Sequence, residues 1–109
     1  MKEWQGEFVF EAGEGTAGET IQERFDRFHA ANPWVLRRLI ELAEEAREHG
    51  ATRVGVGHLF EVLRWRHRMA THDDAAWKLN NDYRSRYARL IQEQRPDLGQ
   101  LIELRRLRA

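Results

Sequence analysis

The sequence predicts a mainly α-helical domain of four helices, of the winged-helix or helix-turn-helix type, with minor β structure. Apolar residues recur at helical spacing in four segments, and signals for helix starts and stops bound these segments. A few short segments rich in β-branched or aromatic residues favour minor β structure. With 109 residues, the chain has the length of one domain with one small core.

The first 18 residues differ in composition from the rest of the chain. Residues 3–10 favour a short strand, whereas residues 11–19 contain three Gly, three Glu and no large apolar side chain. We therefore expect a flexible acidic N-terminal arm over residues 1–18, followed by a single helical domain over residues 19–109.

The first helix is expected over residues 20–30. Thr20 followed by Glu23 matches the capping box, in which two side chains satisfy backbone N–H groups at a helix start. The inward face at helical spacing is formed by Ile21, Phe25 and Phe28.

The second helix, over residues 32–49, has the clearest boundaries. Asn32 is the expected N-cap, Pro33 occupies the first helical position, and Gly50 stands just past the end. The apolar stripe between them predicts a helix that packs on the core along one face.

The third helix is expected over residues 58–69, after a short β-like segment at residues 52–56. Its predicted inward face consists of Leu59, Phe60, Val62, Leu63 and Trp65, and its predicted outward face of Glu61, Arg64, Arg66 and Arg68. Residues 70–79 form a connection, which Trp77 and Leu79 are expected to anchor to the core.

The fourth helix is expected to begin at a cap, Asn80 or Asn81, and to end near Gln94, because the residue before Pro96 avoids the α region. Residues 101–108 are compatible with either a strand or a last helical turn. In a winged helix, the strand at residues 52–56 would pair with a C-terminal hairpin, and the third core helix would enter the DNA major groove. The predicted inward face is Tyr83, Tyr87, Leu90 and Ile91.

The inventory of residue types excludes several kinds of site. The chain has no Cys, which rules out disulfides, thiolate catalysis and Cys-based zinc sites. The only Ser, Ser85, lacks a nucleophile elbow, and His67 and His72 do not have the spacing of a zinc-protease helix. We therefore expect no enzyme activity, no cofactor and no metal. No apolar run approaches the roughly 20 residues of a membrane span, and no signal peptide is recognisable, so a cytoplasmic protein without a membrane partner is expected.

Charge is unevenly distributed, although the formal net charge is zero. Residues 1–23 carry six Glu and one Lys, a net charge of −5, and residues 51–109 carry twelve basic and seven acidic side chains, a net charge of +5. Nearly all basic residues are Arg, which binds phosphate through two parallel hydrogen bonds. This asymmetry favours an anionic partner, and we hypothesise double-stranded DNA. GC-rich codon usage is an alternative reason for the Arg content.

The best candidates for DNA contact lie at the start of the fourth helix. Arg can bond both guanine acceptors and Asn both polar groups of adenine in the major groove, while Ser and a helix N-terminus can hold phosphate. These candidates are Asn80, Asn81, Arg84, Ser85, Arg86 and Arg89. Phosphate contacts are also expected from two flanking pairs, Arg66 with Arg68 and Arg105 with Arg106. The alternative for each group is an Asn cap or a solvated polar face.

Four segments stand out as motifs: FHAANPWV at 28–35, VGHLFEVLRW at 56–65, WKLNNDYRSRYARLI at 77–91 and LIELRRLR at 101–108. In these segments the chain resembles a family of small uncharacterised proteins encoded in tailed phages and prophages. The resemblance covers about residues 24–109 and implies a phage-linked context and a helical fold. It supplies no catalytic residues.

The alternative to DNA binding is a non-catalytic protein-interaction module that binds and redirects a host protein. Zero net charge favours this alternative, because dedicated DNA-binding domains are usually basic overall. An exposed apolar patch would mark the interacting surface, and aromatic residues on the arm are expected anchors. These anchors are Trp4, Phe8 and Phe10. Both functions are compatible with a homodimer.

Overall fold

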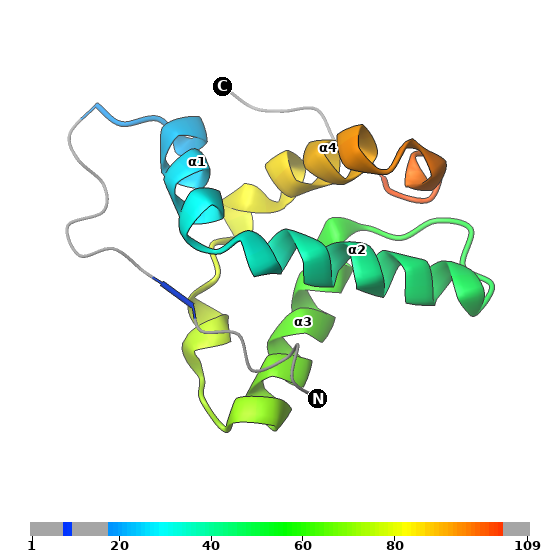
Figure 1. Cartoon of the computed structure of the whole chain (residues 1–109), viewed down its shortest axis with the longest axis horizontal. Coiled ribbons are helices and arrows are strands. Elements are labelled where there is room, and N and C mark those ends of the chain that lie inside the picture. The colour runs from blue at the N-terminus through cyan, green and yellow to red at the C-terminus, as the bar shows by residue number, and fades with distance from the viewer. Residues whose placement is uncertain (1–7, 10–17, 104–109) are drawn as a thin grey trace.

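The computed structural model describes residues 8–9 and 18–103, which form four α-helices joined in part by short 3-10 helices (Figure 1). The α-helices are α1 (Ile21–Ala31), α2 (Pro33–Glu48), α3 (Val56–Thr71) and α4 (Arg84–Gln94). The 3-10 helices are η2 (Ala75–Lys78), η3 (Asn81–Tyr83) and η4 (Pro96–Leu98). The prediction of a mainly helical fold with four helices is confirmed.

The boundaries of α1 and α2 follow from the signals in the sequence. The Thr20 hydroxyl accepts the Glu23 N–H at 3.1 Å, and the Glu23 carboxylate accepts the Thr20 N–H at 2.9 Å, so the capping box is present. Pro33 begins α2, and Gly50 follows its end with φ of +93°, a left-handed conformation that residues with a Cβ rarely adopt.

The segment between α3 and α4 is longer than the turn of a helix-turn-helix, because η2 and η3 lie within it. Asn80 caps η3, since its side-chain oxygen accepts the Asp82 N–H at 2.8 Å. The expected Asn cap therefore exists, but it begins η3, and α4 starts only at Arg84.

In Figure 1, α2 and α4 lie side by side, and α3 crosses α2 at a steep angle. α1 packs against α2 and against η3, the short turn that leads into α4. The far end of α3 extends beyond the other helices, and η2 returns along it.

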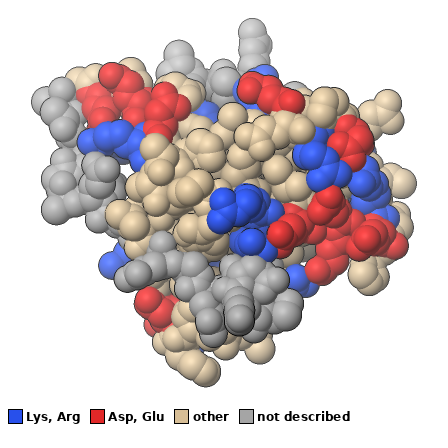
Figure 2. Space-filling model, viewed as in Figure 1, with Lys and Arg blue, Asp and Glu red and all other residues tan. Residues whose placement is uncertain are grey.

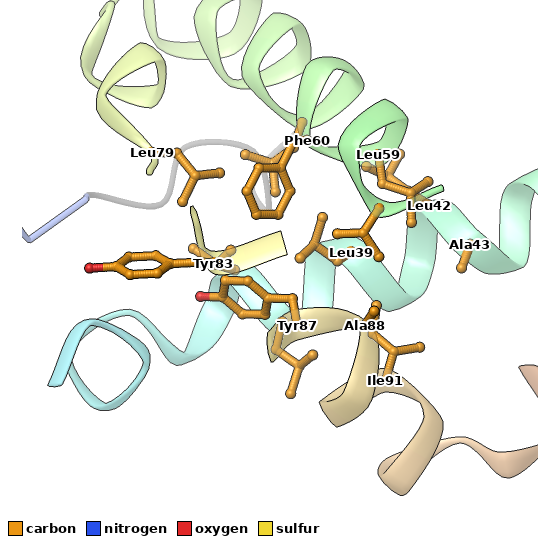
Figure 3. Close-up of a cluster of buried hydrophobic side chains, with 14 of the residues drawn as sticks. Leu39, Leu42, Ala43, Leu59, Phe60, Leu79, Tyr83, Tyr87, Ala88 and Ile91 are labelled. Atoms are coloured by element: carbon orange, nitrogen blue, oxygen red, sulfur yellow. The ribbon is translucent and has the colours of Figure 1, made fainter. Parts of the chain in front are cut away.

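The core lies where α2, α3 and α4 meet, and Figure 3 shows their apolar side chains pointing toward one another. Tyr87 is fully buried, and its ring meets Phe25 edge to face with centroids 4.9 Å apart and Phe60 with centroids 5.9 Å apart. Burial raises the pKa of the Tyr87 phenol far above its usual value. Each aromatic or aliphatic side chain buried here contributes roughly 1.5–3 kcal/mol to folding.

The expected minor β structure is not seen, since residues 8–9 and 18–103 contain no strand. Val54 and Ile102 form one isolated parallel bridge, in which the Val54 N–H donates to the Leu101 carbonyl at 2.8 Å and the Glu103 N–H donates to the Val54 carbonyl at 3.1 Å. α3 begins at Val56, earlier than expected, so few residues between α2 and α3 are left to form a strand.

Candidate interaction surface

α3 buries Leu59, Phe60 and Leu63 as predicted, but two of its residues lie on the opposite side from the one expected. Arg64, expected in solvent, is 4% exposed, whereas Trp65, expected in the core, is 58% exposed. The helical period explains both results. Arg64 lies one turn after the buried Phe60, whereas Trp65 lies roughly 200° around the helix from the buried Leu63. The assignments of Arg64 and Trp65 from their residue types alone were therefore wrong.

The buried Arg64 guanidinium is bonded to three oxygen atoms. Its Nη2 donates to the Leu79 carbonyl at 2.8 Å and to Asn81 Oδ1 at 2.6 Å, and its Nη1 donates to Glu61 Oε1 at 2.7 Å. The guanidinium carbon also lies 5.6 Å from the centroid of the Phe60 ring. Arg64 thus ties the connection after η2 to α3.

Three large apolar side chains gather on the surface at the far end of α3, and we call them the Trp65 cluster: Trp65, Met69 and Trp77. Met69 is 71% exposed and Trp77 is 45% exposed. The two indole rings meet edge to face, with centroids 6.0 Å apart and planes at 81°. The prediction that Trp77 anchors the connection to the core was wrong, because Ala76 and Leu79 are the buried residues there.

The Trp65 cluster lines an open hollow of about 360 Å³, together with Arg68 and His72. No acidic residue is among those that line it in the described part of the chain. Arg68 Nε donates to Asp74 Oδ1 at 2.7 Å, and His72 ends α3 in a left-handed conformation with φ of 59°. The hollow therefore combines apolar walls with two basic side chains.

The two Asn residues predicted to read bases are engaged within the chain. Asn80 uses its side-chain oxygen to cap η3, and Asn81 Oδ1 accepts the bond from Arg64. A base contact through either oxygen would have to share it with the bond that the oxygen already accepts, through its second lone pair.

The structure places the remaining α4 candidates in the first two turns of that helix. Arg84 is exposed, and Ser85, Arg86 and Arg89 are partly exposed. The Arg84 Nε donates to the Asn81 carbonyl at 3.0 Å, and the Arg86 Nε donates to Gln22 Oε1 of α1 at 3.1 Å. α4 therefore brings these side chains together, but Arg84 and Arg86 also bond back to the chain.

Arg66 and Arg68 are both paired with carboxylates. Arg66 makes two hydrogen bonds to Glu45 of α2, one of them 2.9 Å long, and these bonds raise the pKa of Arg66 and lower that of Glu45. In the view of Figure 2, several basic side chains likewise lie next to acidic ones, and uncharged surface separates these groups. The described residues seen in this view therefore form no continuous basic surface for a phosphate backbone.

Several predicted residues lie outside the described residues: Trp4, Phe10, Arg105 and Arg106. Phe8, the third expected anchor of the arm, is not exposed. Its ring packs against Trp34 with centroids 4.7 Å apart and against His67 with centroids 5.0 Å apart. At residues 8 and 9, the expected acidic arm therefore contacts the helical domain.

Asn32 occupies the N-cap position of α2, as predicted, but its side chain does not cap the helix. The side-chain amide instead bonds both main-chain polar groups of Val9. The capping interpretation was therefore right about the position and wrong about the partner.

No helix in the described residues combines the length and apolar character that crossing a membrane needs. Within residues 8–9 and 18–103, no three His, Asp or Glu side chains come together as a metal site would require. His67 is buried beside aromatic rings, whereas His72 lies at the exposed end of α3.

Comparisons with protein-family models, curated proteins and solved structures give no match to this chain. The resemblance to phage-encoded proteins stays a prediction. A helical fold by itself does not specify a function, which depends on the groups at the surface of the molecule.

Proposed function

We propose that the chain is a non-catalytic protein-interaction module that binds a partner protein through the Trp65 cluster. The observation that supports this function is the exposure of two indoles and a thioether side by side, around one open hollow. Burial of apolar groups of this size is favourable in water, so their joint exposure supports the proposal that a partner covers this surface. Trp is the residue type most enriched at binding hot spots, and Met adapts to irregular partners.

The chemistry of the hollow suits one kind of partner segment. Trp65, Met69 and Trp77 suit a large apolar side chain, and Arg68 and His72 suit a carboxylate beside it. In the structure, Arg68 is paired with the largely exposed Asp74, with Arg68 Nε 2.7 Å from Asp74 Oδ1. The partner segment therefore carries an apolar anchor flanked by Asp or Glu, and its carboxylate replaces Asp74. The resemblance to phage-encoded proteins favours a protein of the bacterial host.

Binding of double-stranded DNA by a winged-helix-like arrangement is less well supported. It would depend mainly on the first turns of α4, where Arg84 and Arg86 already bond back to the chain. Asn81, Arg66 and Arg68 likewise have side-chain partners within the chain. Neutral overall charge also weakens attraction to a phosphate backbone.

The test is photo-crosslinking of the full chain in bacterial cells, with a benzophenone amino acid at position 69. The control carries the same amino acid at position 48, at the exposed end of α2. We expect a single protein crosslinked from position 69, through a segment with an apolar and an acidic residue, and loss of that product with Trp77→Ala. Equal products from both positions would exclude the Trp65 cluster as the binding surface. A product made of two copies of the chain would show that the partner at this surface is a second copy and not a host protein.

The DNA alternative is tested separately, by fluorescence anisotropy of a labelled random duplex at increasing salt. Tight binding that weakens steeply with salt and is lost on combining Arg84→Ala with Arg89→Ala would establish DNA as the partner. We expect no such binding.

A further inference from the structure

A second site, away from the Trp65 cluster, holds a short segment of the chain. The Val9 N–H donates to Asn32 Oδ1 at 2.7 Å, and Asn32 Nδ2 donates to the Val9 carbonyl at 3.0 Å and to the Phe28 carbonyl at 3.0 Å. Asn32 is 0% exposed. A carboxamide that bonds both polar groups of one residue recognises an extended backbone without regard to its side chain.

The residue before Val9 supplies the side-chain contact. Phe8 lies in an aromatic pocket formed by Phe28, Trp34 and His67, and the Trp34 and His67 rings stack with centroids 5.7 Å apart. The Val9 side chain, in contrast, is 47% exposed. Main-chain bonds at one residue and a side-chain pocket at its neighbour are the usual means of recognising an extended peptide.

The start of α2 does not depend on a hydrogen bond from the Asn32 side chain. Its own N–H donates to the Phe28 carbonyl at 2.9 Å, its carbonyl accepts the Val35 N–H at 3.1 Å, and its side chain makes no cap hydrogen bond. The buried Asn32 amide stands at a helix start, yet its side chain bonds the main chain of a residue 23 positions away.

We infer that the Asn32 cleft, formed by Asn32, Phe28, Trp34 and His67, is an exchangeable site for an extended segment of a partner protein. The segment consists of an aromatic residue followed by any residue except proline, because Asn32 Oδ1 requires an N–H to accept. Phe8 and Val9 occupy the cleft from within the same chain until such a segment displaces them. Neither residue is part of a helix or strand, so displacement leaves the helices intact. This inference is independent of the Trp65 cluster.

The test uses the full chain with Phe8→Ala and a synthetic peptide with the sequence of residues 5–9, blocked at both ends. This peptide contains a single aromatic residue, which fixes its register. Two control peptides carry Phe8→Ala or Val9→Pro, and a third experiment adds Asn32→Asp to the Phe8→Ala chain. Binding is measured by NMR shifts of the Trp34 indole, with far-UV circular dichroism as the check on folding. Phe8→Leu replaces Phe8→Ala if the latter does not fold.

We expect the peptide to bind the Phe8→Ala chain at least about tenfold more tightly than the wild type, in which the tethered segment competes. Neither control peptide should bind, and Asn32→Asp should abolish binding. A folded Phe8→Ala chain that binds no peptide at millimolar concentration, or binds all three equally, overturns the inference. A wild-type chain that sediments as a dimer, and as a monomer with Phe8→Ala, would assign the cleft to a second copy and overturn the partner segment.

Discussion

Trp65 and Trp77 meet edge to face on the surface of the domain, with ring centroids 6.0 Å apart, although they come from different elements and both are exposed. An edge-to-face pair is worth about 0.5–1.5 kcal/mol beyond the area it buries. The core of this domain is complete without these indoles, since Phe60, Leu63 and Tyr87 fill the space between the helices. The Trp65 cluster is therefore separable from the fold, which allows stability and binding to be tested independently.

Trp65→Ala is expected to lower the free energy of unfolding by about 1 kcal/mol or less, because the lost contacts are those of an exposed aromatic pair. Phe60→Ala, one turn earlier in the core, is the matched control, with an expected loss of about 3–5 kcal/mol. Urea unfolding followed by far-UV circular dichroism measures both. Equal losses would mean that the Trp65 indole is a core side chain and not a binding group.

Arg64→Ala is expected to lower the free energy of unfolding by about 3 kcal/mol, because the Leu79 carbonyl and the Asn81 side chain lose their bonds to the guanidinium. Arg84→Ala, at an exposed position of α4, should change it by less than about 0.5 kcal/mol. The same urea experiment compares the two variants. If Arg64→Ala lowers the free energy of unfolding as little as Arg84→Ala does, the hydrogen bonds of Arg64 contribute nothing to stability.

The contrast between Arg64 and Trp65 also shows how far the sequence predicts this fold. The helices were predictable because Thr20, Pro33 and Gly50 act locally, through backbone groups within one turn. Most of the inward face of α3 was also predictable, since Leu59, Phe60 and Leu63 are buried as expected. Arg64 and Trp65 were misassigned because they were placed by residue type and not by the helical period. Phe60, Arg64 and His67 follow the 3.6-residue repeat on the buried side, a signal that was available in the sequence.

The candidate sites were less predictable than the helices, because they depend on contacts between distant residues. Asn32 has the sequence pattern of a cap, and nothing near it indicates that its amide bonds Val9. Likewise, the neighbours of Trp77 do not show that η2 brings its indole to Trp65, across the connection after α3. Such pairings form only when the chain is packed, and periodicity does not encode them.

Tyr87→Phe is expected to leave the free energy of unfolding unchanged or to raise it by about 1 kcal/mol. The Tyr87 hydroxyl is buried and has no hydrogen-bond partner among the described residues, so its removal relieves a desolvation cost while the ring stays in place. Tyr87→Ala, which removes the ring as well, should cost about 3–5 kcal/mol. Thermal unfolding of the three proteins measures the order, and a Phe variant less stable than wild type by more than about 1 kcal/mol would require a bond to the hydroxyl.

His29 is expected to make the domain less stable in mild acid. Partial burial lowers the pKa of His29, against an opposing effect of Asp26, and its ring stacks on Phe25 with centroids 5.8 Å apart. Its Nδ1 is buried without a hydrogen-bond partner in the described part of the chain. A proton on this ring therefore favours the unfolded chain, where the imidazole is hydrated.

The direction of the pH effect follows from the lowered pKa. Above the unfolded value of about 6.5, His29 is neutral in both states and its contribution to stability is complete. As the pH falls below that value, the unfolded chain takes up the proton first, and the free energy of unfolding declines until the folded pKa is passed. His29→Gln removes this decline, so the difference between wild type and variant in urea unfolding should change between pH 7.5 and pH 5.5. Parallel curves over this range would show that the burial of His29 has no effect on its protonation.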